Sequence, residues 1–171
     1  MSSTSRYVIS FVVIVAAQVL LNVYCGFTPY LVLNLLPLAI LSLPYGTNTT
    51  WSVVLAFLVG LAVDFISTGT LGLNSIALMP VALARRPILS LTASDFVSFP
   101  QSENPLTRLD TLKVALTALL SCTLFLAVFS VVETAGTRPF GFVVLRVLFS
   151  SAVDAALFVA VERLMFTNDL R

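Results

Sequence analysis

Three charged residues stand inside apolar stretches of the sequence: Asp64, Arg146 and Asp154. A bare charge at the bilayer centre costs about 2.5 to 3.5 kcal/mol on insertion scales, so each charge should face a bundle interior or water and have a partner. In the membrane-spanning helices predicted below, a rise of about 1.5 Å per residue places both Asp64 and Arg146 roughly 20 Å from the cytoplasmic side of the membrane. This equal depth predicts an Asp64–Arg146 ion pair. Asp154 lies deeper, near the level of Lys113, which predicts a second pair.

The sequence offers little for catalysis. It contains no Gly-rich phosphate loop, no Gly-x-Gly-x-x-Gly and no Gly-x-Ser-x-Gly nucleophile elbow. The absence of histidine excludes His-based acid–base chemistry and His-ligated metals. Cys25 and Cys122 form no Cys-x-x-Cys pair and are predicted to be buried small apolar residues. We therefore expect no catalytic residue, no metal and no cofactor, and predict that the chain is not an enzyme.

Composition predicts the environment of these residues. Of the 171 residues, 58% are hydrophobic and 10% are charged, and the mean hydropathy is +1.04. Soluble domains carry about 25% charged residues. The apolar residues come in runs of about 20, the length that a helix needs to cross a bilayer. A net charge of +1 gives no basic patch for nucleic acid. The prediction is an all-α membrane protein with a single integral membrane domain, 1–171.

Six transmembrane helices are predicted. They cover about 7–25, 30–43, 51–66, 71–84, 109–132 and 140–164. Pro37 predicts a kink in the second span, whose freed carbonyl neighbouring helices would satisfy. The fourth span is short and contains Pro80, which leaves open a thin kinked span or a re-entrant segment. The longest polar stretch is predicted to begin at Arg85-Arg86-Pro87, directly after this span.

Basic residues orient the predicted spans. Cytoplasmic loops carry an excess of Lys and Arg. With six spans and a cytoplasmic N-terminus, most basic residues fall at or near the cytoplasmic side: Arg6, Arg85, Arg86, Arg108, Lys113, Arg163 and Arg171. Arg138 alone would face outward. Both termini are therefore predicted to be cytoplasmic.

Residues at four-residue spacing form stripes on two of the predicted helices. The polar stripe of the sixth span comprises Arg146, Ser150 and Asp154. A second stripe, of small residues on another face, comprises Ala152, Ala156 and Ala160. The third span carries Ser52, Ala56 and Gly60, in the same register as Asp64. Two interpretations remain open: the stripes hold the six helices together, or they line a ligand or partner site.

The sequence around Asp64 resembles the rod shape-determining protein MreD family, in the form found in Bacteroidota-type bacteria. The resemblance rests on Phe57-Leu58-Val59-Gly60-Leu61-Ala62-Val63-Asp64-Phe65, then Thr70-Leu71-Gly72-Leu73-Asn74, then Arg85-Arg86-Pro87. The family shows Gly-x-x-x-Asp near the end of a span and Leu-Gly opening the next helix, positions that Gly60, Asp64, Leu71 and Gly72 occupy here. The resemblance extends to Gln18-Val19-Leu20-Leu21-Asn22 and to the second span, which contains a proline.

This resemblance implies a non-catalytic component of the bacterial cell-elongation (rod) complex in the inner membrane. Such a protein binds an MreC-like bitopic partner, and through it is linked to the wall-synthesis glycosyltransferase and transpeptidase and to actin-like filaments. The family's six-helix fold resembles that of the substrate-binding subunits of energy-coupling-factor transporters. The alternative function is therefore a small-molecule binding subunit, with Asp64 and Arg146 lining its pocket.

Overall fold

The computed structural model describes residues 3–24, 32–68, 71–92, 104–134 and 139–166, and this part of the chain is helical without β-strands. The α-helices are α1 (Ser3–Tyr24), α2 (Leu36–Leu41), α3 (Thr49–Val63), α4 (Leu73–Thr92), α5 (Thr111–Thr134) and α6 (Phe140–Phe166). A π-helical turn, Asp64–Thr68, extends α3, and a 3-10 turn, Pro105–Arg108, precedes α5. The predicted all-α class is confirmed.

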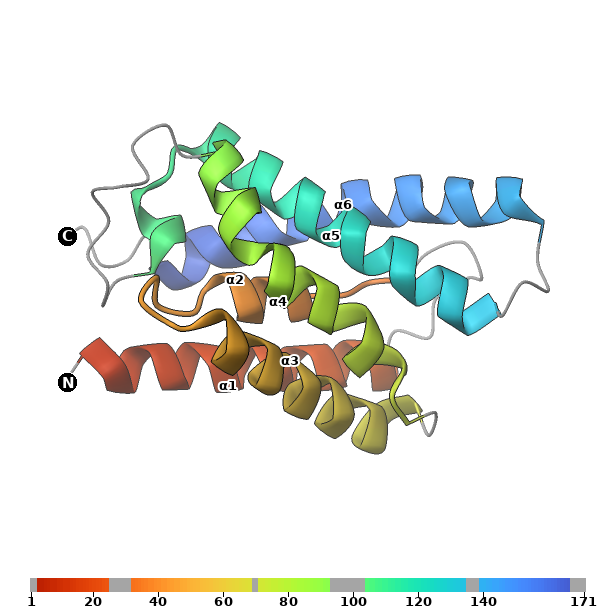
Figure 1. Cartoon of the computed structure of the whole chain (residues 1–171), viewed down its shortest axis with the longest axis horizontal. Coiled ribbons are helices and arrows are strands. Elements are labelled where there is room, and N and C mark those ends of the chain that lie inside the picture. The colour runs from red at the N-terminus through yellow and green to blue at the C-terminus, as the bar shows by residue number, and fades with distance from the viewer. Residues whose placement is uncertain (1–2, 25–31, 69–70, 93–103, 135–138, 167–171) are drawn as a thin grey trace.

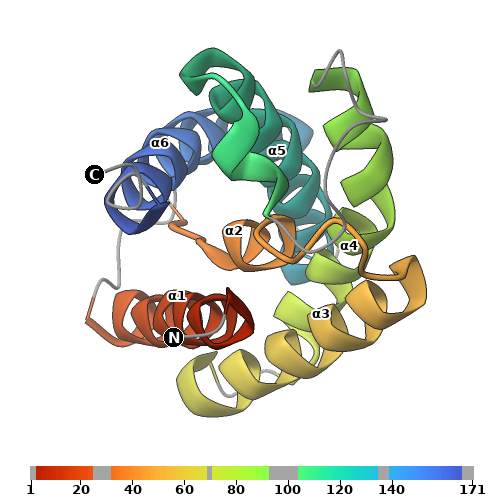
Figure 2. The ribbon, with the colours of Figure 1, turned by 90° about the vertical axis from the view of Figure 1, so that its left-hand side faces the viewer.

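The five long helices surround the short α2, which sits in the middle of the bundle when viewed end-on (Figure 2). Helices α1, α3 and α5 run in one direction, whereas α2, α4 and α6 run back (Figure 1). The start of α1 and the end of α6 consequently lie at the same end of the bundle. All six residues of α2 are buried.

The outer surface of this bundle is apolar and much of its interior is polar. Large hydrophobic side chains such as Leu112, Phe140 and Phe149 are exposed. Asp64, Asn74 and other polar side chains are fully buried. Within the described residues, three helical stretches are long and apolar enough to cross a membrane: Thr49–Ile66, Thr111–Thr134 and Phe140–Arg163. Since water-soluble proteins place large apolar patches inside, this surface identifies a membrane protein.

The second predicted span differs most from the structure. Over the described part of 30–43, the chain is not helical at 32–35 and helical only over Leu36–Leu41, so the predicted kinked helix over this span is wrong. Pro37 lies in the first turn of α2, where its missing N–H costs no hydrogen bond, and it causes no kink. We call residues 32–41 the central segment. A run of apolar residues in a sequence predicts a membrane span. The central segment is apolar for another reason, because the surrounding helices bury it.

The fourth predicted span is too short. Helix α4 continues to Thr92, with both Pro80 and Pro87 inside it. The predicted polar loop at Arg85-Arg86-Pro87 is therefore wrong, because Ile88 and Leu89 beyond it are buried and extend the packed face of the helix. Helices α3, α5 and α6 lie within three residues of the predicted third, fifth and sixth spans. Helix α1 covers residues 7–24 of the predicted first span, 7–25.

Candidate functional site

The non-helical start of the central segment, 32–35, is held by side chains from other helices. The Ser150 hydroxyl and the Asp154 carboxylate, both on α6, accept hydrogen bonds from the backbone N–H groups of Val32 and Asn34, each at 3.0 Å. A non-helical stretch cannot satisfy its own backbone polar groups, and lipid offers no replacement. The polar stripe predicted on the sixth span therefore faces inward and binds the central segment.

Helix α1 holds the same stretch from the other side. The Gln18 side-chain oxygen accepts a hydrogen bond from the Leu35 N–H at 2.6 Å, and its Nε2 donates to the Leu33 carbonyl at 3.2 Å. The same Nε2 donates to the Asn22 side chain at 2.8 Å. Gln18 is fully buried. These contacts give a physical role to the polar residues late in the first predicted span.

Two asparagines link the central segment to α4 and then to Asp64. Asn34 Nδ2 donates to Asn74 Oδ1 at 3.2 Å, and Asn74 Nδ2 donates to Asp64 Oδ1 at 2.7 Å. The Asn34 side-chain oxygen accepts a hydrogen bond from the Leu36 N–H at the start of α2. All three side chains are buried. Together with the Asn34–Asp154 contact, this chain connects two carboxylates, Asp64 and Asp154, across the middle of the bundle.

The Asp64 carboxylate also holds the start of α4. It accepts hydrogen bonds from the backbone N–H of Gly72 at 2.9 Å and from that of Asn74 at 3.1 and 3.2 Å. The first N–H groups of a helix have no intrahelical partner, and its N-terminus attracts negative charge. Gly72 has a φ of +97°, which only glycine adopts without strain. The motif residues Asp64 and Gly72 therefore form one helix-reversing unit, while Leu71 is exposed.

The small-residue stripe of α3 packs against α4. Ser52, Ala56 and Gly60 are all buried. A Cβ added at Gly60 would lie 2.5 Å from the backbone N and Cα of Ser75, so no larger residue fits there. The Ser75 hydroxyl donates to the Phe57 carbonyl at 3.1 Å. This stripe is thus an internal contact between helices.

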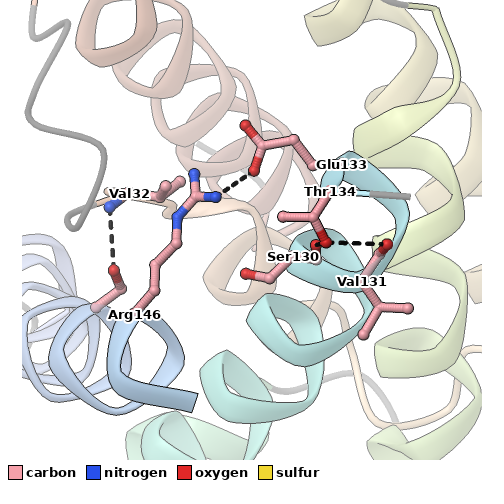
Figure 3. Close-up of polar contacts among 7 residues, drawn as sticks. Val32, Ser130, Val131, Glu133, Thr134 and Arg146 are labelled. Carbon is pink, nitrogen blue, oxygen red and sulfur yellow. Dashed lines mark hydrogen bonds and ion pairs between the residues drawn. The ribbon is translucent and has the colours of Figure 1, made fainter. Parts of the chain in front are cut away.

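Arg146 pairs with Glu133, so the predicted Asp64–Arg146 pair is wrong. The guanidinium of Arg146, which is 8% exposed, forms a salt bridge with the Glu133 carboxylate near the end of α5 (Figure 3). The prediction used only the equal depth of Asp64 and Arg146 in the membrane, and equal depth does not show which helices lie side by side. Helix α5 extends past the predicted end of the fifth span, and this brings Glu133 next to α6.

The predicted Lys113–Asp154 pair is not formed either. Asp154 is 1% exposed, and Asn34 supplies the hydrogen bond that its carboxylate accepts within the described residues. Lys113 is only partly buried. The inner face of α6 meets the central segment at this position, and this separates Asp154 from the first turn of α5.

A second arginine, Arg85, was missed as a site residue because the sequence placed it in a loop. It is 2% exposed, and its guanidinium donates to the carbonyls of Leu43 and Pro44, just after α2. The neighbouring Arg86 is exposed. Arg85 therefore holds the chain just after the central segment, while Gln18 and Asp154 hold the beginning of the segment. The sequence did contain a signal that the helix continues past Arg85: the apolar residues Ile88 and Leu89 extend the apolar face of α4.

The alanine stripe of α6 takes no part in these contacts. Ala152, Ala156 and Ala160 are all exposed. They lie away from the buried stripe of Arg146, Ser150 and Asp154, so α6 has one face turned to the bundle and one free of it. An apolar depression of about 370 Å³ lies elsewhere, on α3 and the turns after it, lined by Leu58, Leu61, Ala62, Phe65 and Leu71.

Comparison with family models, with curated proteins and with solved structures finds no match. The comparisons assign no family. In the part of the chain that the structure describes, no group of three or more Cys, Asp or Glu side chains is placed to hold a metal ion. The described arrangement is a polar junction that fixes a non-helical segment inside a membrane bundle, with its carboxylates and amides largely bound to each other and to backbone groups.

Proposed function

We propose that this chain is a non-catalytic inner-membrane component of the bacterial cell-elongation complex, and that it binds a bitopic, MreC-like partner. In this proposal the chain crosses the membrane six times with both termini in the cytoplasm, and the central segment forms part of the second passage. The link to wall-synthesis enzymes and actin-like filaments is indirect, through that partner. The observation that carries the proposal is the free alanine face of α6.

The resemblance in sequence gains support from what its residues do. Gly60, Asp64 and Gly72 join α3 to α4: a close backbone contact, a carboxylate at the start of the next helix, and a positive φ. Each of these roles is architectural. Motif residues that hold the protein's own helices together fit an assembly function better than a catalytic one.

The free face of α6 suits a partner helix. Helices in lipid associate through close packing and not through a hydrophobic effect, so small residues at four-residue spacing favour contact. Ala152, Ala156 and Ala160 have this spacing and are not used within the described chain. Leu148 and Phe149, also exposed on α6, add large side chains beside the stripe.

The alternative, a small-molecule binding subunit, has less support. It requires Asp64 and Arg146 to line one pocket, yet Asp64 is bound by Gly72 and Asn74 while Arg146 pairs with Glu133. Calorimetry on the purified protein tests this alternative: saturable binding of a small ligand that is lost in Asp64→Asn, with the fold retained, would favour it.

Co-purification tests the proposed function. Affinity-tagged protein, extracted from its own host in mild detergent, is expected to bring down the MreC-like protein, and Ala156→Leu is expected to reduce this recovery at least tenfold. The matched control is Ala62→Leu, at an alanine that is also exposed, on α3 across the bundle from α6 (Figure 2). Unchanged recovery in leucine variants at all three alanine positions would overturn the assigned face. Failure to recover any such partner would overturn the function.

Gene order gives a second test. Genes for an MreC-like protein and wall-synthesis enzymes beside this one support the elongation complex, whereas genes for paired ATPase subunits support the transporter alternative.

A further inference from the structure

Asp154 has one carboxylate oxygen bound and the other unpaired. Oδ1 accepts the hydrogen bond from the Asn34 N–H at 3.0 Å. Oδ2 is buried and has no hydrogen-bond partner within the described residues. The side chain is 1% exposed, so water does not replace the missing partner at its surface. Asp64 differs from it, since both of its oxygens accept hydrogen bonds.

The groups that the structure describes around Asp154 are neutral. From α5, the Cys122 thiol is the titratable group that interacts with it electrostatically. Cys122 is itself buried in an apolar cluster with Leu38, Ala155 and Phe158. From the central segment comes the Asn34 amide. On α6, the Ser150 hydroxyl accepts a hydrogen bond from Val32 and the Ser151 hydroxyl donates to the Leu148 carbonyl. Among the described residues Asp154 forms no ion pair.

An ionised carboxylate in such surroundings is costly. A buried charge needs a countercharge or a full set of hydrogen bonds, and an ion without them is better accommodated in its neutral form. A proton on Oδ2 removes the charge and leaves Oδ1 free to accept from Asn34. The unpaired atom is thus the one at which a proton fits without breaking an existing contact.

We propose that Asp154 is a proton-binding site, occupied while the central segment is docked in the bundle. Loss of the proton places an uncompensated negative charge beside the Cys122 thiol and the apolar cluster, and the docked arrangement loses stability. The binding of one proton in the membrane interior is in this way coupled to the position of the central segment. The inference stands apart from the proposed partner and holds for either function.

Infrared spectroscopy of the whole protein in lipid vesicles tests the site directly. Wild-type protein at neutral pH is expected to show the carbonyl stretch of a protonated carboxyl group, and the difference spectrum against Asp154→Asn is expected to contain that band. Asp110→Asn, at an exposed aspartate, is the matched control and is expected to leave the band in place. Asparagine keeps the acceptor for Asn34, so the fold is expected to survive.

Isotope labelling gives a second form of this experiment that needs no variant. When the aspartate carboxyl groups of the wild-type protein are isotopically labelled, the carbonyl band of the protonated carboxyl group is expected to shift. A spectrum in which every aspartate is ionised at neutral pH would overturn the proposal, as would a band that persists unchanged in Asp154→Asn.

Stability against pH tests the coupling. A carboxyl group that is neutral when folded contributes stability at low pH, and this contribution is lost as the pH rises. Between about pH 5 and about pH 8, the wild-type protein is expected to lose stability to unfolding relative to Asp154→Asn. Equal pH slopes in the two proteins would overturn the coupling. Stabilisation of the wild-type protein by sodium or potassium, absent from the variant, would show a metal cation in place of the proton.

Discussion

The side-chain amide of Asn34 donates a hydrogen bond to the side-chain oxygen of Asn74, 3.2 Å away, and this contact joins the central segment to α4. Forty positions separate the two residues in the chain. Asn74 passes the connection on to Asp64. The carboxylate at the start of α4 and the Asn34 amide of the central segment therefore belong to one hydrogen-bonded network, and a change at one affects the other.

Asn74→Ala is expected to destabilise the protein by about 1 to 2 kcal/mol, because it leaves buried polar groups of Asn34 and Asp64 without a partner. Unfolding in mixed micelles, followed by circular dichroism, measures the change. Asn48→Ala is the control, since Asn48 is exposed and its side chain makes no capping hydrogen bond. Equal stability of the two variants would contradict the network.

Gly60→Ala is expected to destabilise the bundle, since the added Cβ would lie 2.5 Å from the Ser75 backbone and α4 would have to move. Gly141→Ala provides the comparison: a Cβ there meets nothing within 4 Å, and alanine in place of glycine inside a helix gains about 0.5 to 1 kcal/mol. The midpoint of thermal unfolding should therefore fall in the first variant and stay level or rise in the second. A rise in both would refute close packing at Gly60.

Arg146 and Glu133 are expected to be energetically coupled. In a double-mutant cycle with Arg146→Met and Glu133→Gln, the double variant should be more stable than the sum of the single changes predicts, because each single change leaves its partner's charge unpaired. The same cycle between Arg146→Met and Asp64→Asn should be additive within about 0.5 kcal/mol. Coupling in the second cycle but not in the first would restore the pair expected from the sequence.

Arg85→Ala is expected to weaken the docking of the central segment, because the carbonyls of Leu43 and Pro44 lose their donor. Hydrogen–deuterium exchange over residues 32–45 should rise clearly in this variant. Arg86→Ala removes the same charge one position later from an exposed side chain and should leave the exchange unchanged. Similar exchange in the two variants would mean that Arg85 acts only through its charge.

Regular features of the fold were accessible from sequence. The helical class, the extents of α3, α5 and α6, and the burial of Cys122 follow from composition and from the lengths of apolar runs. The division of α6 into a polar stripe and an alanine stripe on different faces follows from spacing along one helix. These are properties of single segments, and a periodic pattern is enough to define them.

What the amino-acid sequence determined by itself is therefore a set of apolar helices with particular faces, and a glycine, Gly72, placed where the chain reverses between two of them. Only the tertiary structure decided the partners of the charged residues: Arg146 pairs with Glu133, Arg85 binds the carbonyls of Leu43 and Pro44, and Asp64 and Asp154 bind backbone N–H groups. It also decided that residues 32–35 are not helical. The physical reason is that side chains from α1 and α6 satisfy the hydrogen-bonding groups of this backbone. No local pattern in the sequence predicts where those two helices lie relative to it.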